Sequence, residues 1–454
     1  MQTERVRGTR RWCGLAILVL LAVLASACGA RFEDTASTTQ SGGLGSTDAG
    51  GSAGPGTTAV GDGSATTLPG ATITTLATGG VATPTTGGAI DPGPTTGVTA
   101  DSIKIGVLVP ITGAAPIPSQ FDKGVRSYYT DLNAKGGLNG RKIDVVIEDT
   151  TSSASVGKTK AQKLIEQDKV FAIVVLDRLE NQKAIGDYLE SRHVPNLEIQ
   201  AAPDLTSSKA AWTFGVTIDH VVQGRLIADY FVRSLKATKV AVIQENTPIL
   251  NPGRQAFTDE IAKLGAEVVF SRAIDGQGND FSSEALGLSR SGATATWLYM
   301  APTPAAKLSN QADALGYHPT WFANSISWGF DLIFTVGPKA LAGARAFSPW
   351  LPLSDPRTQA FQDAYRANNN NDTPDDIGIV GWGVGEIVVA GLRKAGPKLG
   401  QNNFRDAMQN LSFRPTVWAP ISFRPGVHLG ANMVAVLKES GGKWALEHDF
   451  TDRF

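Results

Sequence analysis

Cysteine is nearly absent from this chain, which has 454 residues but only two cysteines, Cys13 and Cys28. Both lie close to the N-terminus, so the rest of the chain has no residues for an internal disulfide or a thiolate metal site. Histidine is also scarce; its positions are His193, His220, His318, His428 and His448. No two of these have helical zinc spacing, and there is no H-E-x-x-H motif. We therefore expect no metal site and no cofactor.

The chain also has little net charge, −1, with 41 Lys and Arg residues against 42 Asp and Glu residues. A balanced charge produces no broad basic or acidic field, so we expect no nucleic-acid partner. The apolar fraction of 42% is sufficient for one or two substantial hydrophobic cores.

Complete catalytic motifs are missing as well. A G-x-S-x-G pattern at residues 50–54 lies in low-complexity sequence, without the strand and helix that a nucleophile elbow requires. Gly157-Lys158-Thr159 resembles the end of a P-loop, but Ser152 stands where the first glycine of that motif belongs. Asp177, Arg178 and Glu180 form an acid/base cluster, a salt-bridged loop or a set of ligand contacts, and the sequence leaves these alternatives open. We expect no enzyme.

The N-terminus has the three parts of a signal peptide. Arginines begin it, an apolar run from Leu15 to Leu24 follows, and the small residues Ala25-Ser26-Ala27 precede Cys28. This last segment resembles a bacterial lipobox, which predicts a signal peptide over residues 1–27 and a lipidated Cys28. The lipid would anchor the protein to the cell membrane on its extracytoplasmic side. The alternative is an uncleaved membrane anchor, for which the apolar run is short.

A low-complexity segment follows, from Gly29 to about Ala100. It consists mostly of Gly, Thr, Ser, Ala and Pro, and it has too few large apolar residues to offset the entropy of ordering. We therefore expect residues 28–100 to form a disordered tether behind the lipidated cysteine.

From Asp101 onward, strand and helix patterns alternate in two successive series. The expected strands are residues 103–109, 143–148, 171–176, 195–197, 239–244, 267–270, 295–300 and 320–323, with a final hairpin over 433–446. Helical spacing of apolar residues separates many of these strands, for example Ala305, Leu308, Ala312 and Leu315. The apolar stretch from Ile377 to Leu392 contains Glu386 and is too short to span a membrane, so we expect a core helix. The pattern predicts an α/β protein with parallel sheets.

Four segments of this region resemble the leucine/isoleucine/valine-type (type I) periplasmic binding proteins of ABC transporters. They are residues 103–113, the segment N-A-K-G-G-L-N-G-R at 133–141, residues 202–206, and K-E-S-G-G-K-W at 438–444. The resemblance implies two Rossmann-like lobes joined by three crossovers, near Phe214–Thr217, Ala346–Pro352 and Val417–Ile421. The first lobe would comprise residues 101–216 and 352–419, and the second lobe residues 217–351 and 420–450. It also implies a small-molecule ligand and a permease partner, and we expect a monomer.

The family's ligand contacts lie on the loops after the strands, and this chain departs from them. Leu179, Glu180 and Asn181 stand where the family offers Ser or Thr to a substrate carboxylate. Ala201 stands where the family usually has a Thr. Ser325 stands where the family often has the acidic residue that holds a substrate ammonium, and Ile117 or Pro118 stands where it has an aromatic lid. The walls that we expect are Thr112, Gly113, Glu180, Asn181 and Gln200 in the first lobe and Asn246, Met300, Thr303, Ser325 and Trp328 in the second. Trp328 and Trp350 either stack on a ligand or pack at a lobe edge. Without a carboxylate clamp, a small polar ligand fits better than a free zwitterion.

Two functions follow from the resemblance. The first is the binding subunit of an ABC importer, which captures a small polar ligand that is amino-acid-like or a related metabolite. The alternative is a ligand sensor of the same fold, which signals to a membrane partner without transport.

Overall fold

The computed structural model describes residues 91–113, 120–200, 210–323, 331, 333–337 and 339–454. These residues all lie in one compact unit, Thr83–Phe454. The expected signal peptide, Cys28 and most of the expected tether lie outside the described residues.

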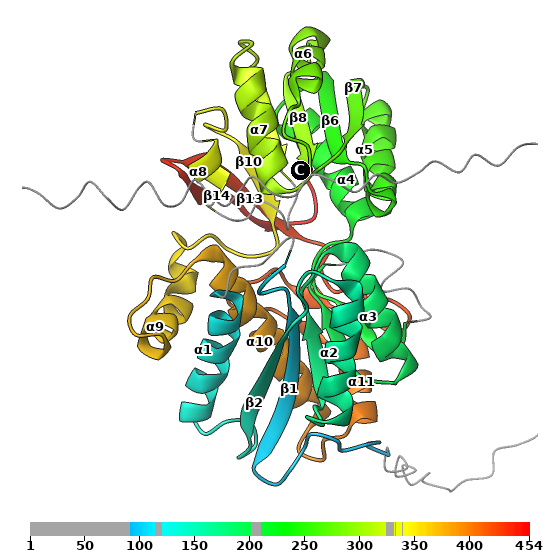
Figure 1. Cartoon of the computed structure of the whole chain (residues 1–454), viewed down its shortest axis with the longest axis vertical. Coiled ribbons are helices and arrows are strands. Elements are labelled where there is room, and N and C mark those ends of the chain that lie inside the picture. Colours follow the sequence, from blue (N-terminus) through cyan, green and yellow to red (C-terminus); the bar gives the residue numbers. More distant parts are fainter. Residues whose placement is uncertain (1–90, 114–119, 201–209, 324–330, 332, 338) are drawn as a thin grey trace, which may run out of the picture. The chain divides into compact units, whose positions relative to one another are not determined.

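The first lobe is built on a parallel sheet with the spatial strand order β2-β1-β3-β4-β5. Figure 1 labels β1 and β2 of this sheet, which lie side by side. Its strands are β1 (Ser102–Val109), β2 (Lys142–Asp149), β3 (Ala172–Val175), β4 (Asn196–Glu198) and β5 (Thr213–Gly215). Its helices are α1 (Gln120–Ala134), α2 (Ala154–Glu166), α3 (Leu179–Ser191), α9 (Gln359–Asn368), α10 (Asp376–Ala395) and α11 (Gln401–Gln409). A 3-10 turn, η3 (Pro356–Thr358), precedes α9, and a short antiparallel pair, β11 (Ser412–Phe413) and β12 (Ile421–Ser422), follows α11.

The second lobe has a mixed sheet with the order β14-β13-β10-β9-β8-β6-β7. Its strands are β6 (Lys239–Glu245), β7 (Glu267–Ile274), β8 (Ala295–Tyr299), β9 (Thr320–Ala323), β10 (Arg345–Ser348), β13 (Val434–Ser440) and β14 (Lys443–Thr451). Strand β13 is antiparallel to both of its neighbours, β10 and β14, and the other pairings are parallel. Its helices are α4 (His220–Asp229), which continues as a π-helical turn η1 (Tyr230–Ser234), then η2 (Pro248–Leu250), α5 (Asn251–Lys263), α6 (Ser282–Ser291), α7 (Pro302–Asp313) and α8 (Ile333–Val336).

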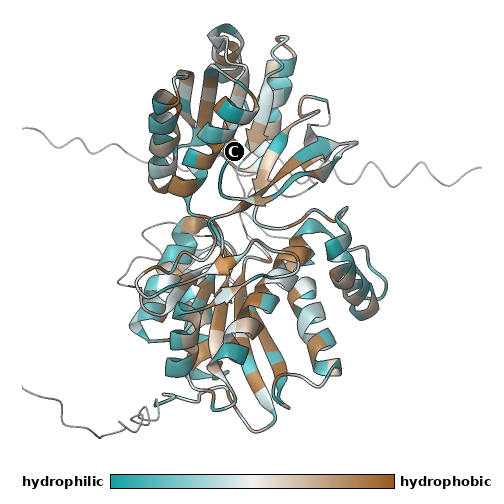
Figure 2. Cartoon of the chain, turned by 180° about the vertical axis from the view of Figure 1, so that it is seen from behind, coloured by the Kyte–Doolittle hydropathy of each residue, from teal (hydrophilic) through white to brown (hydrophobic). Residues whose placement is uncertain are grey.

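Both sheets are covered on their two faces, as the apolar strand patterns predict. In β1, Ile105 and Val107 belong to the core under α1 and α10, whereas Leu108 belongs to the core under α2 and α3. The hydropathy colours agree, since the strands are largely apolar and the outward faces of the helices are polar (Figure 2). The expected alternation and the core helix over residues 377–392 are therefore confirmed. Leu315, however, lies beyond the end of α7 and is 49% exposed, so it was wrongly assigned to the apolar face of that helix.

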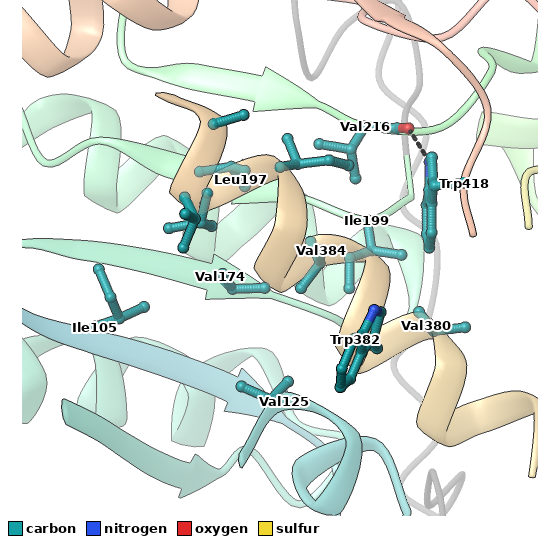
Figure 3. Close-up of a cluster of buried hydrophobic side chains, with 14 of the residues drawn as sticks. Ile105, Val125, Val174, Leu197, Ile199, Val216, Val380, Trp382, Val384 and Trp418 are labelled. Carbon is teal, nitrogen blue, oxygen red and sulfur yellow. Dashed lines mark hydrogen bonds between the residues drawn. The ribbon is translucent and has the colours of Figure 1, made fainter. Parts of the chain in front are cut away.

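Helix α10 completes the first lobe although it lies more than 150 residues after the last strand of that sheet. It packs on α1 so closely that a Cβ at Gly124 would lie 1.9 Å from the carbonyl oxygen of Gly378. A Cβ at Gly381 would likewise lie 2.4 Å from the carbonyl oxygen of Phe121. Figure 3 shows Val384 of α10 and Ile199, which directly follows β4, in the same cluster of buried side chains. Within the described ranges, no helix is long and apolar enough to cross a membrane.

The last crossing between the lobes falls later than the sequence predicts. Ile421, Phe423 and Ala431 belong to the core of the first lobe, and the Phe423 ring packs edge-on to Phe214 at 5.3 Å. The chain enters the second sheet only at β13, so residues 420–431 were wrongly placed in the second lobe. The reason is that β12 is a two-residue strand that turns back to pair with β11, and so short an element has no periodicity to detect.

An N-terminal arm, residues 91–98, is ordered on the first lobe, which corrects the expected tether boundary at about Ala100. The carbonyl oxygen of Pro94 accepts a hydrogen bond from the backbone N–H of Gln401 at 2.8 Å, and that of Pro92 accepts one from Asn402 at 3.0 Å. These are first-turn N–H groups of α11 that have no partner within the helix. Gly97 packs against the entry to β3, where a Cβ would lie 2.4 Å from the backbone nitrogen of Phe171. The arm therefore caps a helix from 300 residues away in the sequence.

Removal of the arm should destabilise the first lobe. A chain that begins at Thr99 loses the capping bonds to α11, and we expect it to unfold about 2–3 kcal/mol more easily than one that begins at Asp91. The measurement is urea denaturation of both chains. As a control, Gly97→Ala should be more destabilising than Gly136→Ala, because both residues have positive φ but only Gly97 is enclosed by backbone. Equal stability of the two truncated chains would contradict the capping role.

Candidate functional site

The carboxyl end of the first sheet is organised by Asp149, the last residue of β2. One carboxylate oxygen accepts hydrogen bonds from the backbone N–H of Ile111 at 2.9 Å and of Thr151 at 2.8 Å. The other accepts the Thr112 hydroxyl at 2.6 Å. Partial burial would raise the pKa of Asp149, but these hydrogen bonds outweigh it and lower the pKa. The expected wall residue Thr112 is therefore fixed at the end of β1, with Gly113 beside Thr151.

A second carboxylate, Asp177, holds the loop between β3 and α3. It is fully buried and accepts hydrogen bonds from the Thr150 hydroxyl, from the backbone N–H of Arg178 at 2.7 Å and from the side-chain amide of Asn181 at 3.0 Å. Gln200, which follows β4, donates its side-chain amide to the backbone oxygen of Asp177 at 2.8 Å. Two predicted wall residues, Asn181 and Gln200, therefore meet at Asp177.

The carboxyl end of the second sheet has its own acidic residue, Glu245, at the end of β6. One oxygen accepts the backbone N–H of Ala301, after β8, at 3.0 Å. The other lies 3.9 Å from the guanidinium nitrogen Nη2 of Arg178, which belongs to the first lobe. Next to this ion pair, Leu179 packs on Ile249 of η2. These contacts bring the ends of β3 and β6 together, although they belong to different sheets.

The remaining predicted wall residues are spread over both lobes. Glu180 is exposed in the first turn of α3. Asn246 is exposed directly after β6, and Thr303 is exposed in the first turn of α7. Met300 is 2% exposed within the second core, so its role there is packing. Trp350 is buried in the first core against Trp418. Five positions lie outside the described residues: Ile117, Pro118, Ala201, Ser325 and Trp328.

Sequence reasoning missed Asp149 and Glu245 as organising residues. A signal was available, because each is a carboxylate at the final position of a parallel strand, where ligand-facing loops begin. It did single out Asp177 and Arg178, and the structure gives these two different roles. Asp177 is hydrogen-bonded to groups of the first lobe, whereas Arg178 extends to the other lobe.

Two buried histidines are satisfied by neighbouring groups. His220 begins α4, and its Nδ1 is hydrogen-bonded to the hydroxyl of Tyr299 at the end of β8. Burial lowers the pKa of His220 to about 4, so its ring is neutral at physiological pH. The Nδ1 of His428 lies 2.9 Å from the carbonyl oxygen of Thr213. In the described parts of the chain, no cluster of three or more His, Cys, Asp or Glu residues is suited to hold a metal ion.

A pair of acidic residues links the lobes at a second place. The backbone N–H of Asp331, just before α8, donates to the carboxylate of Asp376 in the first turn of α10. Asp331 in turn accepts the backbone N–H of Trp444 at 2.8 Å. Burial raises the pKa of Asp376 to about 7, and the nearby charge of Asp331 adds to the rise.

Comparison with known proteins gives a consistent family. A family model described as a periplasmic binding protein matches residues 102–443. An amino acid binding protein of Pseudomonas aeruginosa is 28% identical over 289 residues, which cover 61% of this chain and 74% of that protein. Leu/Ile/Val-binding protein homolog 3 of Brucella melitensis is 24% identical over 299 residues, which cover 65% of this chain and 79% of that protein. A branched-chain amino acid ABC transporter protein of Thermus thermophilus, solved with bound valine, shares the fold with a TM-score of 0.68, 14% identity and coverage of 77% of this chain and 96% of that one.

The raised pKa of Asp376 predicts a pH-dependent stability. Its folded pKa of about 7 lies above its usual value of 3.8, so the folded chain binds more protons between these pH values, and stability falls as pH rises from about 4 to about 7. Asp376→Asn keeps the acceptor for Asp331 but removes the charge. We expect it to stabilise the protein by about 2–4 kcal/mol at pH 8 and to change little at pH 4.

Thermal and urea unfolding of the wild type and Asp376→Asn across this pH range measures the effect. Asp363→Asn, at an exposed position of α9, is the matched control and should follow the wild type. Parallel stability curves for the wild type and Asp376→Asn would show that Asp376 is charged in the folded protein and would refute the prediction.

Proposed function

This chain belongs to the periplasmic binding protein family, and we propose that it captures one small polar molecule, amino-acid-like or a related metabolite, for an ABC importer. Members of this family are substrate-binding proteins of transporters and not enzymes. The proposed site lies at the carboxyl ends of the two sheets, where open α/β sheets bind ligands.

One observation carries this proposal, namely the meeting of the two strand ends through Arg178 and Glu245. Ligand capture between two lobes requires polar groups from both at one place, and each sheet contributes one residue of this ion pair. Each lobe also keeps its own hydrophobic core, so a rotation between them needs little repacking. Closure on a bound molecule would present a new surface to a permease.

The polar groups of the first lobe favour hydroxyl, amide or carbonyl groups on the ligand. Thr112, Asn181 and Gln200 each use part of their hydrogen-bonding capacity on Asp149 or Asp177, and the rest is available to a ligand. The Ser/Thr pattern that holds a substrate carboxylate in amino-acid-binding relatives is replaced here by Leu179, Glu180 and Asn181. This departure supports a ligand other than leucine or valine, although the Thermus thermophilus protein of the same fold was solved with valine.

We also propose that the protein is held outside the cytoplasm by a lipid on Cys28. Support comes from the apolar run and the small residues that precede this cysteine. Lipid anchoring would confine the binding protein near its permease, with which it forms the importer.

The capture function predicts ligand-dependent stability. In a thermal-shift screen of amides, amino acids, aromatic acids and sugars, the cognate ligand at about 100 times its Kd should add about 2.7 kcal/mol of stability. Asn181→Ala should then weaken binding by about 1–3 kcal/mol in calorimetry, because it removes a polar partner of the ligand. Asn368→Ala, on the exposed end of α9, should bind like the wild type. Tight binding of leucine or valine would contradict the proposed loss of the amino-acid clamp.

The anchor predicts a difference between the two cysteines. Cys28→Ala should release the protein from membranes or block its processing, whereas Cys13→Ala should leave it attached, since Cys13 is removed with the signal peptide. The measurement is membrane fractionation with intact mass of the extracted protein. A wild-type mass that shows an unmodified Cys28 would refute the lipid anchor.

A further inference from the structure

The ion pair between the lobes is unequal in its two partners. The Glu245 side chain is 14% exposed and is held in one position, because Ala301 donates to one oxygen and a Cβ at Gly276 would lie 2.7 Å from that oxygen. The Arg178 side chain is 40% exposed, and among the described residues Glu245 is its ion-pair partner. The fixed partner is therefore the carboxylate, and the adjustable partner is the arginine.

The pair is also loose. Its closest nitrogen and oxygen are 3.9 Å apart, beyond the 2.7–2.9 Å of a charge-assisted hydrogen bond. The second oxygen of Glu245 thus faces the first lobe with a cation nearby but with no short bond to it. A cation that reached this oxygen directly would be bound more strongly than Arg178, which makes Arg178 easy to displace.

The charges around the pair are mostly negative. Described residues at or directly after the ends of β2, β3, β4, β6 and β7 include the carboxylates Asp149, Asp177, Glu198, Glu245 and Asp275 and the cation Arg178. Asp149 and Asp177 are satisfied by hydroxyl, amide and backbone donors of the first lobe. Closure of the lobes would desolvate Glu245 further, and a desolvated carboxylate requires a cation.

We propose that Glu245 is the receptor for a cationic nitrogen on the ligand and that Arg178 occupies its place when no ligand is bound. This deepens the proposed function, on which it rests, by naming the ligand class as small amines without a carboxylate. The amine donates to the free oxygen of Glu245, the amide and hydroxyl groups of the first lobe bind its polar remainder, and Arg178 turns to solvent. Arg178 acts as a competitor of the ligand, so its removal should strengthen binding.

Matched probes separate the charges on the ligand. Leucinamide carries the ammonium alone, 4-methylpentanoate the carboxylate alone, leucine both and 4-methylpentanamide neither, and the alanine and phenylalanine series provide two further sizes. Binding to the full-length protein is measured by thermal shift and calorimetry at low salt. In each series, we expect the amino amide to bind better than the carboxylate without an ammonium, the amino acid with both charges, and the amide with neither charge.

Variants of the ion pair then test the two roles. Glu245→Gln should weaken binding of the amide by about tenfold to a hundredfold, the range for loss of a charged hydrogen bond. Arg178→Gln should strengthen it by about twofold to fivefold, which loss of a merely structural residue would not do. Glu267→Gln and Arg290→Gln, exposed at the start of β7 and the end of α6, are the controls and should bind like the wild type.

The outcomes distinguish the two levels of the proposal. The inference is wrong, and the capture function stands, if the amide binds but Glu245→Gln does not weaken its binding. The same holds if Glu180→Gln, and not Glu245→Gln, weakens binding of the amide. Preferred binding of the acid, or weaker binding by Arg178→Gln, also overturns the inference. If no probe stabilises the wild type while a different ligand class does, the named class is wrong; if no small molecule of the wider screen stabilises it, the capture function itself fails.

Discussion

The close contact between α1 and α10 is the constraint on which the rest of the structure depends. The first sheet is complete by residue 215, but one of its faces is covered only when residues 376–395 return to it. Since the whole second sheet except its final hairpin is built in between, the chain has to cross between lobes more than once. The glycines at the contact allow the two backbones to touch, which a larger residue would prevent. The repeated crossings between the lobes are therefore a consequence of how the first core is completed.

The polar end of the first lobe is stable without cations. Asp149 and Asp177 are buried in whole or in part, and each is compensated by several hydroxyl, amide or backbone donors. These carboxylates hold the loops after β1 and β3 through hydroxyl, amide and backbone N–H donors, so they do not need Arg178 as a counter-ion. Arg178 is thereby free to extend to Glu245, and the one ion pair recorded there crosses between lobes. The loops of the first lobe are thus held by hydrogen bonds, and the ion pair at the junction is the charged group that we propose for ligand recognition.

The sequence predicted the elements with strong periodicity and missed those without it. Buried parallel strands such as Ile103–Val109 and the apolar helix after Ile377 are continuous patterns, and both were confirmed. The two-residue strand β12 and the arm at residues 91–98 have no such pattern, because partners distant in sequence hold them in place. For the proposed site, the strand ends suggested Thr112, Asn181 and Gln200, and their ligand contacts stay a prediction. The pairing of Arg178 with Glu245 depends on the packing of two lobes, which no local pattern reveals. Met300 packs in the second core, a burial that its position after β8 alone does not predict.

The arm at residues 91–98 also determines the path of mechanical force. A pull on the chain upstream of Asp91 reaches the carbonyl bonds of Pro92 and Pro94 to α11 before it reaches β1. The load falls on the end of α11 and on β1, an interior strand of the first sheet. Tension on the chain before Asp91 would therefore enter the protein through the first lobe, and it would not directly oppose the proposed rotation of the second lobe.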